Sequence, residues 1–226
     1  MLISVKDAAG RLGVSERRVR AMIEDGGIRG QKVGGRWLVE AGDAAFRVKA
    51  LPIKPLSERA SWLLIDSLSD RSMQAEPVER HRLKDRLGRL FLSEDPVPLL
   101  KAWLRRRARR VEMHINPADL ADFRNDRRIM LSGVSHPDSG LLAGNEAEAY
   151  VSDSAAAAVM NDFLLVEPQP DSPANVVLHI YDRDIGLDFS EVPRLALAAD
   201  LAERAGVREL AAARSLARRA IADSTP

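Results

Sequence analysis

The sequence of 226 residues contains no cysteine, only 4% aromatic residues and no apolar run long enough to cross a bilayer. Without cysteine there are no disulfides, no thiol catalysis and no thiolate metal ligands, which suits a reducing compartment. A membrane-spanning helix needs roughly 20 apolar residues, and the N-terminus lacks the pattern of a signal peptide. The balance of 46% hydrophobic and 30% charged residues is ordinary for a globular chain. We therefore expect a cytoplasmic protein with no membrane segment.

A formal net charge of +1 conceals an uneven distribution along the chain. Residues 1–50 hold ten Lys and Arg against six Asp and Glu, and residues 51–115 hold fourteen against nine. Residues 116–226 reverse the balance, with ten basic residues and eighteen acidic ones. A basic N-terminal part favours DNA as its partner, and the acidic C-terminal part indicates a different task.

Residues 4–39 predict two short helices followed by a hairpin. Ser4 and Asp7 have the spacing of a capping box at the start of the first helix. Gly13-Val14 turns the chain, and Ser15 caps a second helix whose arginines point away from its apolar side. Two strand-like runs then flank Gly34-Gly35, a pair that supplies the positive φ angles of a two-residue hairpin.

Two helices joined by a tight turn are the arrangement that places a second helix in the DNA major groove. Arginines on that helix suit guanine edges and phosphates, and the hairpin would be a wing whose tip cations reach the DNA backbone. A small helical module that docks protein is the alternative interpretation. The predicted DNA-binding residues are Ser15, Arg17, Arg18, Arg20, Lys32, Gly34, Gly35 and Arg36.

On these residues the N-terminal part resembles a known family. Residues 2–46 are similar to the excisionase-type (MerR-like) winged helix-turn-helix module. The matching positions are Ala8-Ala9, Leu12 to Ser15, Arg18-Val19, Gly34 to Trp37, and a short helix near Asp43–Phe46. The resemblance implies a winged helix that binds double-stranded DNA, with Trp37 as part of its core.

The middle of the chain predicts a linker and three helices. Two prolines in residues 48–56 indicate the linker, and helices follow at residues 56–69 and 76–91 and from Pro96 or Pro98 into 102–110. The apolar positions expected to face inward in the second helix are Val78, Leu83, Leu87, Leu90 and Phe91. The basic run at the end of the third has two interpretations: a solvated helix end, or accessory phosphate contacts by Arg105, Arg106 and Arg109.

Beyond residue 110 the pattern predicts short strands alternating with helices, among them strands at 128–134, 148–151, 163–166 and 175–182. Two helices close the chain. The predicted fold class is α+β, with an N-terminal winged helix-turn-helix, a helical middle segment, and a C-terminal small mixed sheet with flanking helices. The expected domains are residues 1–50, 51–110 and 111–226.

No known catalytic or cofactor-binding motif is present in the sequence. Asp182, Asp184 and Asp188 could hold Mg²⁺ but are more typical of a turn. His179 has no acid spaced along its strand to pair with, and Asp200 is expected to be exposed, pairing with Arg204 or facing a partner. We therefore expect no enzyme activity, catalytic residue, cofactor or metal.

The C-terminal part carries a second resemblance. Residues 127–152, 175–182 and 192–221 are similar to the C-terminal domain of AbiE-type antitoxins, on the strand with Leu131-Ser132-Gly133, the Tyr150-Val151 strand, and the Asp200-Leu201 helix with Arg208. The resemblance implies a transcriptional repressor of a type IV toxin–antitoxin operon, with a nucleotidyltransferase-like toxin as functional partner. An excisionase-like architectural protein and an enzyme targeted to DNA are the alternatives. A two-fold symmetric operator would require a homodimer.

Overall fold

The computed structural model describes residues 2–12, 15–24, 28–40, 54–69, 74–182, 191–204 and 206–224. The chain divides into two compact units, unit 1 (residues 1–53) and unit 2 (residues 54–226). The predicted turn at 13–14, the helix near 43–46 and most of the predicted linker lie outside the described residues, as do Asp184 and Asp188.

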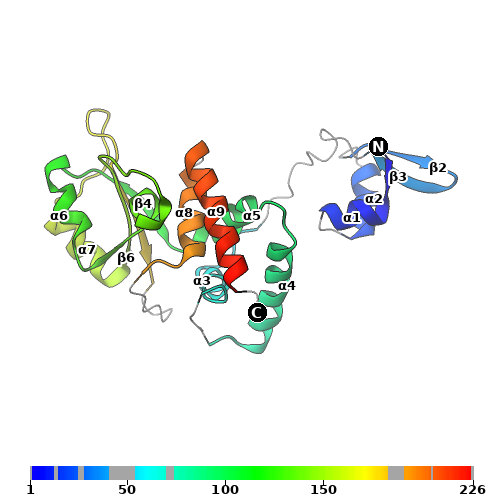
Figure 1. The fold of residues 1–226 in the computed structure, drawn as a ribbon, viewed down its shortest axis with the longest axis horizontal. Coiled ribbons are helices and arrows are strands. Elements are labelled where there is room, and N and C mark those ends of the chain that lie inside the picture. The colour runs from blue at the N-terminus through cyan, green and yellow to red at the C-terminus, as the bar shows by residue number, and fades with distance from the viewer. Residues whose placement is uncertain are drawn as a thin grey trace. The chain divides into compact units, whose positions relative to one another are not determined.

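Unit 1 is a helical pair against a small sheet (Figure 1). The three strands lie in the order β1-β3-β2, and both pairs are antiparallel. Strand β1 was not predicted, because three residues are too few to show a period-2 pattern. The elements are β1 (Leu2–Ser4), α1 (Val5–Leu12), α2 (Glu16–Glu24), β2 (Gly30–Val33) and β3 (Arg36–Glu40).

One apolar core holds unit 1 together. Val5, Ala8 and Ala9 of α1 pack against Val19 of α2 and Val39 of β3, all of them buried. These are the positions that the helical spacing predicts for the inward faces. Trp37 is half-buried against the same core, as the sequence predicts for the base of the hairpin.

Unit 2 contains a four-stranded mixed sheet in the order β4-β7-β6-β5. Strands β6 and β7 are parallel, and the other two pairs are antiparallel. This arrangement confirms the predicted α+β class with a small mixed sheet. The helices and strands are α3 (Glu58–Asp66), α4 (Pro77–Phe91), α5 (Val97–Trp103), β4 (Arg109–Met113), α6 (Leu120–Arg124), β5 (Ile129–Leu131), β6 (Ala147–Ser152), α7 (Asp153–Asp162), β7 (Val176–Tyr181), α8 (Arg194–Arg204) and α9 (Val207–Asp223). Single 3₁₀ turns are η1 (Leu104–Arg106), η2 (Pro117–Asp119), η3 (Gly133–Ser135) and η4 (Pro137–Ser139).

The two faces of this sheet differ in chemistry. Helices α6 and α7 cover one face, and α8 and α9 lie on the other side (Figure 1). Alternate residues of β6 and β7, such as Ala149 and Leu178, join Phe123 of α6 and Val159 of α7 in an apolar core. The residues between them point to the opposite face, and there they include ionisable side chains. No helix among the described residues combines the length and apolar character of a membrane span.

The helices that precede the sheet differ in part from the prediction. Trp62 of α3 is buried as expected, and its Nε1 donates to the carbonyl oxygen of Arg107 at 2.8 Å. In α4 only Leu90 is fully buried, and Val78 and Phe91 are 61% and 46% exposed. The inward assignment of these two was wrong because they lie about 100–120° around the helix from Leu90, beyond the side that packs.

The predicted domain boundary at residue 110 differs from the structure, in which residues 54–110 belong to the same unit as the sheet. Helix α5 ends at Trp103 rather than running through the basic segment, and β4 begins at Arg109. Between them Arg107 is 1% exposed and bonds to residues of β6 and α8. The middle segment is therefore part of the C-terminal fold.

Residues 163–166 do not form the predicted strand. Val166 makes one isolated bridge, with His114, and Leu164 has a φ of 49°. A leucine in that left-handed region interrupts the extended backbone that a strand requires.

Candidate nucleic-acid interface

Side-chain caps fix the beginnings of both helices of unit 1. The Ser4 hydroxyl accepts from the backbone N–H of Asp7 at 3.0 Å and donates to the Asp7 carboxylate at 2.7 Å. The Ser15 hydroxyl accepts from the backbone N–H of Arg18 at 3.3 Å, at the start of α2. Caps of this kind satisfy N–H groups that have no partner inside the helix. They confirm both predicted helix starts.

Helix α2 separates an apolar side from a basic one. Val19, Met22 and Ile23 are buried, whereas Arg17, Arg18 and Arg20 are exposed. Arg20 donates to the Glu16 carboxylate at 3.0 Å, one helical turn earlier. Arg17 and Arg18 make no ion pair within the described residues, so their guanidinium groups are available to bind phosphates or guanine edges.

The hairpin between β2 and β3 has a two-residue loop. Gly34 and Gly35 have φ angles of 57° and 81°, the positive values that such a loop requires. Lys32 pairs with Trp37, and Arg36 pairs with Val33. Because paired residues share a face and neighbouring residues alternate, the two exposed cations belong to opposite faces of the hairpin. A DNA backbone beside one face would meet Lys32 or Arg36, and both only if it passed over the tip.

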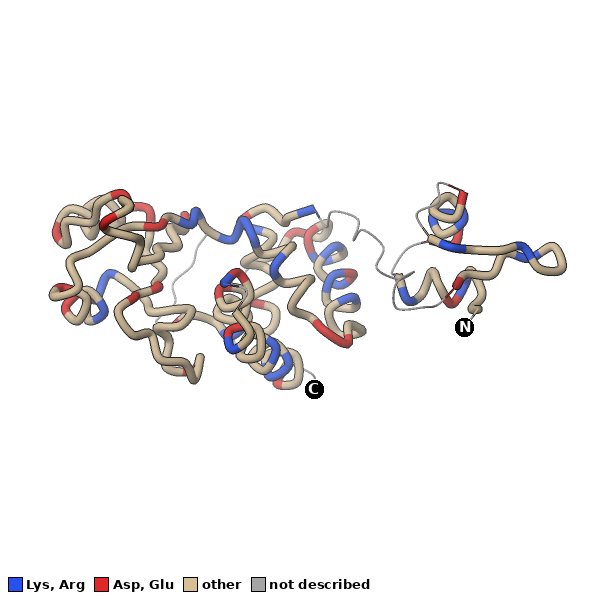
Figure 2. Tube along the Cα trace, turned by 90° about the horizontal axis from the view of Figure 1, so that it is seen from above, with Lys and Arg blue, Asp and Glu red and all other residues tan. Residues whose placement is uncertain are grey.

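The arginines of the basic segment, residues 105–110, differ in exposure and in the element that carries them. Arg105 and Arg106 are exposed on η1, Arg107 is buried, and Arg109 is exposed at the start of β4. Figure 2 shows that basic residues occur in both units and that many acidic ones lie close to them in unit 2. Within the described residues Arg105, Arg106 and Arg109 make no ion pair, so their accessory DNA contact stays a prediction.

Comparison with known families bears on unit 1. A family model described as a helix-turn-helix domain matches residues 2–43. Unit 1 contains a helix-turn-helix domain. This match covers the two capped helices and the hairpin, and it supports a DNA-binding regulator. Searches of the curated proteins and of the solved structures gave no match for the chain.

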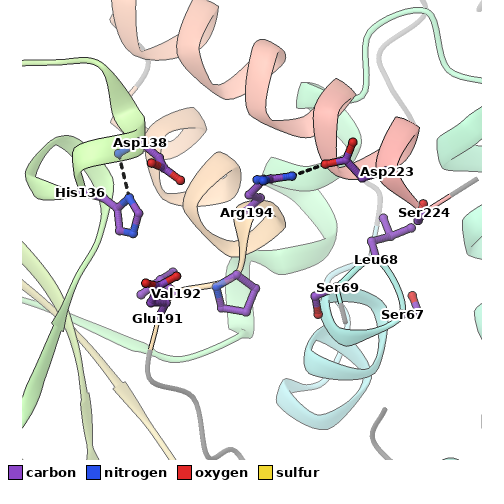
Figure 3. Close-up of a pocket in the computed structure, with 11 residues that line it drawn as sticks. Ser67, Leu68, Ser69, His136, Asp138, Glu191, Val192, Arg194, Asp223 and Ser224 are labelled. Carbon is purple, nitrogen blue, oxygen red and sulfur yellow. Dashed lines mark hydrogen bonds and ion pairs between the residues drawn. The ribbon is translucent and has the colours of Figure 1, made fainter. Parts of the chain in front are cut away.

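Outside the helix-turn-helix domain, unit 2 has a cleft of about 570 Å³. It lies between the end of α3, the turn η4, the start of α8 and the end of α9 (Figure 3). An ion pair between Arg194 and Asp223 crosses it. Asp138 and Glu191 add two further carboxylates to its lining. Three carboxylates around one arginine do not suit a phosphate-bearing ligand.

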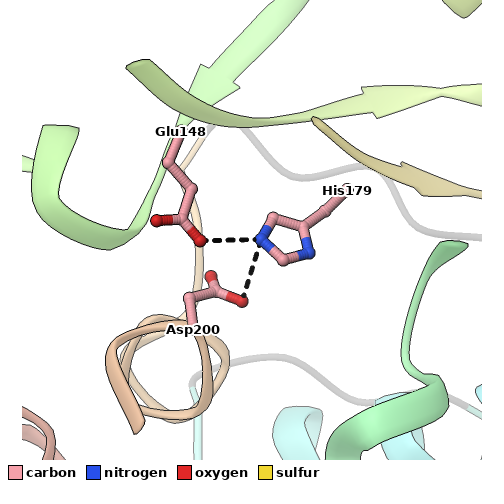
Figure 4. A group of neighbouring side chains, drawn as sticks. All are labelled: Glu148, His179 and Asp200. Carbon is pink, nitrogen blue, oxygen red and sulfur yellow. Dashed lines mark hydrogen bonds and ion pairs between the residues drawn. The ribbon is translucent and has the colours of Figure 1, made fainter. Parts of the chain in front are cut away.

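The polar face of the sheet carries a charged cluster that the sequence did not reveal. Glu148 on β6, His179 on β7 and Asp200 on α8 lie together, each at most 1% exposed (Figure 4). His179 Nε2 lies 2.9 Å from a Glu148 oxygen and 3.5 Å from an Asp200 oxygen. The expectation that His179 lacks an acidic partner was wrong, and so was the expectation that Asp200 is exposed.

Two arginines complete the cluster. The Arg107 guanidinium donates to Asp200, to the Tyr150 hydroxyl at 2.6 Å and to Glu203 at 2.6 Å. Arg204 donates to Glu148 at 2.7 Å rather than to Asp200, its predicted partner. The i,i+4 spacing predicts pairs within one helix, so it could not show that Arg204 pairs with a residue of the sheet instead.

The electrostatics match this bonding. Burial alone would raise the pKa of Glu148, but the bonds and charges of His179 and Arg204 outweigh it and hold that pKa below its ordinary value. For Arg107, which is charged when protonated, burial acts in the direction of a lower pKa. The charges of Asp200, Tyr150 and Glu203 outweigh burial and raise this pKa well above its usual range. Burial raises the pKa of Tyr150, so its hydroxyl stays protonated and donates to Asp200 at 3.0 Å.

The three side chains of Figure 4 have the donor types of a divalent metal site, with ligand atoms within 4.8 Å of one another. Their ligand atoms are already engaged. Both Glu148 oxygens are bonded, to His179 and Arg204. The Asp200 oxygens accept from Arg107, Tyr150 and Ser132. A metal ion would have to displace buried guanidinium groups, so the arrangement fits a structural ion-pair network.

Proposed function

We propose that this protein is a sequence-specific DNA-binding regulator that acts in the cytoplasm without catalytic activity of its own. The observation that carries the proposal is the helix-turn-helix match over residues 2–43, together with Arg17 and Arg18 on the capped second helix. Both arginines are exposed and make no ion pair among the described residues. In this scheme α2 lies in the major groove and the hairpin contacts the backbone of a duplex operator, which a homodimer reads if it is two-fold symmetric.

The direct test is the double variant Arg17→Ala/Arg18→Ala. Each lost base-edge contact should cost roughly 1–3 kcal/mol of discrimination between operator and random DNA. Operator and random duplexes are titrated by fluorescence anisotropy. The control is Lys6→Ala, which removes an exposed cation from α1 and should leave the preference unchanged. An operator preference that survives the double variant would contradict the assignment of α2.

At a finer level we propose that the regulator is the antitoxin and repressor of a type IV toxin–antitoxin operon. The sequence resemblance of residues 127–152, 175–182 and 192–221 to AbiE-type antitoxins supports this role. The functional partner is then a co-encoded nucleotidyltransferase-like toxin, with or without a stable complex.

The two roles can be separated in the full-length chain. Arg17→Ala/Arg18→Ala should abolish repression yet still rescue cells that express the neighbouring toxin. Toxin rescue is scored by growth, and repression by a reporter fused to the operon promoter. Rescue that disappears together with DNA binding would show that repression alone protects the cell, and the antitoxin proposal would be withdrawn.

A further inference from the structure

Helix α4 carries more basic residues without an ion pair than any other described helix of unit 2. It holds five basic residues, Arg80, Arg82, Lys84, Arg86 and Arg89, and two acidic ones, Glu79 and Asp85. Glu79 binds Arg59 at 2.8 Å. Asp85 lies 3.9 Å from His81, and its charge also acts on Arg86. None of the five basic residues makes an ion pair within the described ranges.

Elsewhere in unit 2 the arginines divide between those that make no ion pair among the described residues, such as Arg208 and Arg219, and those with a carboxylate partner. Arg110 pairs with Glu112, Arg128 with Asp126, and Arg214 with Asp95. Helix α4 is distinct because five basic residues without an ion pair in the described ranges lie on one helix. An exposed ion pair contributes little to stability, but a carboxylate that occupies a guanidinium does reduce its availability to another anion.

The basic residues of α4 fall on two sides of the helix. At about 100° per residue, Arg82, Arg86 and Arg89 form one row, and Arg80 and Lys84 lie on the opposite side of Leu90. We call the row Arg82, Arg86 and Arg89 the basic strip. Figure 2 shows the basic segments along this part of unit 2.

One contact holds the basic strip at Arg89, and the surroundings of Arg86 act on its charge. The Arg89 guanidinium lies over the Trp103 ring, 5.0 Å from its centroid, and Trp103 is itself buried. Partial burial, and then the neighbouring charge of Arg82, lower the pKa of Arg86. Like charges held side by side on a fixed helix are unfavourable unless an anion neutralises them. Arg89 also lies close to the start of η1, because it contacts Trp103 and η1 follows Trp103 directly in the chain.

We propose that the basic strip of α4 binds the phosphate backbone of DNA beside the site read by the helix-turn-helix domain. The proposal rests on the proposed function. Residues four apart on a helix are spaced by about 6 Å along its axis, and duplex DNA presents a charge every ~1.7 Å, so each arginine of the strip meets its own phosphate. Phosphate contacts add affinity without sequence preference.

The length of chain between the units limits where this contact lies. Thirteen residues separate the end of β3 at Glu40 from the start of unit 2 at Lys54, which allows a span of at most about 50 Å. The test duplexes therefore carry the operator with about 15 base pairs of flanking DNA on each side. A random duplex of the same length serves as the nonspecific ligand.

The test compares two double variants of the full-length protein that remove equal charge from the same helix. Arg82→Gln/Arg86→Gln should lower the slope of log affinity against log salt by about two on both duplexes. Arg80→Gln/Lys84→Gln, on the other side of α4, should change it by less than about half a unit. Arg82→Gln alone, at an exposed position, should lower the slope by about one, and it guards against any effect of Arg86 on folding.

Each outcome decides something. Equal slope changes in the two double variants, or no change in either, would contradict the proposal that the basic strip binds DNA. If the strip variants change the oligomeric state in light scattering but keep the slope, α4 contacts protein instead and the proposal fails. If the wild type shows no operator preference but the strip variants still lose slope on random DNA, the proposed function fails and the strip stands. No DNA binding by the wild type overturns both.

Discussion

Arg17 and Arg18 of unit 1 and Arg107 of unit 2 have opposite roles. In unit 1, Arg17 and Arg18 are exposed on α2 and make no ion pair among the described residues. In unit 2, Arg107 is 1% exposed and donates to a hydroxyl, two carboxylates and a backbone carbonyl. Arg17 and Arg18 can bind an anionic group of another molecule, whereas Arg107 uses its hydrogen bonds within the protein.

The difference follows from solvation. An exposed guanidinium keeps its water until an anion replaces it, so its removal changes binding and hardly affects stability. A buried guanidinium has lost its water and depends on its partners, so the loss of one partner leaves an uncompensated charge. Variants at the two kinds of position should therefore separate binding from stability.

The largest effect is expected from Asp200→Ala. The substitution leaves Arg107 buried without its main carboxylate and should destabilise unit 2 by about 3–5 kcal/mol. Chemical denaturation of the full-length protein measures the change. The matched control, Asp122→Ala, removes an exposed aspartate from α6 and should stay within about 0.5 kcal/mol. Equal stability of the two variants would mean that the cluster does not hold α8 to the sheet.

Acid should weaken unit 2. The folded-state pKa of Glu148 lies below its ordinary value of 4.5 because His179 and Arg204 outweigh the effect of burial. Bonds from Arg214 and Arg128 lower the pKa values of Asp95 and Asp126 in the same way. A lowered carboxyl pKa contributes stability that is complete above the unfolded value and is lost as the pH falls through the folded one.

Melting temperatures measured between pH 7 and pH 3 should therefore fall on the acid side of about 4.5. The variant Glu148→Gln should melt lower at pH 7 but show a shallower decline with acid, because its side chain no longer titrates. If its acid dependence equals that of the wild type, the decline comes from other carboxylates.

A smaller effect distinguishes neighbouring arginines of α2. Arg18→Ala should weaken operator binding by roughly 1–3 kcal/mol if Arg18 contacts a base edge. Arg20→Ala should weaken it less, because Arg20 already pairs with Glu16. Anisotropy titrations of both variants, with Glu16→Gln as the variant that releases Arg20, measure the difference. Equal losses at the two positions would show that the ion pair opens on DNA.

The smallest expected change is at the hairpin tip. Arg36→Ala should lower the log–log salt slope by about one and weaken binding to all sequences alike. Lys32→Ala should do so less if only one face of the hairpin meets the backbone. A relaxed preference at one base pair, with an unchanged slope, would instead make the hairpin a reader of bases.

Local chemistry allowed much of the fold to be predicted. Ser4 and Ser15 were expected as helix caps, and each accepts from a backbone N–H at the helix start. The Gly34-Gly35 turn was predicted from the backbone angles that only such a pair adopts readily. These features depend on residues at most four apart, so the sequence displays them directly.

The buried cluster could not be predicted because its partners are far apart in the chain. Ser132 and Arg107 lie 68 and 93 residues from Asp200, their common partner. Arg107 is also one arginine within a basic run, and nothing local distinguishes it from Arg106. The only local sign was the glycine at position 133, in the segment carrying the antitoxin resemblance. The structure gives its reason: Gly133 has a φ of 51°, and a Cβ there would collide with Glu148.

The parallel pairing of β6 with β7, closed by α8, has a consequence for synthesis on the ribosome. Unit 1 ends at residue 53, whereas Arg107 must wait for Asp200 on α8. Domains generally fold as units as the chain emerges, N-terminal first. The helix-turn-helix domain can therefore fold while most of unit 2 is still untranslated. A nascent chain released before α8 would carry a folded DNA-binding domain, but one face of its sheet would be uncovered, and Arg107 and His179 would lack Asp200.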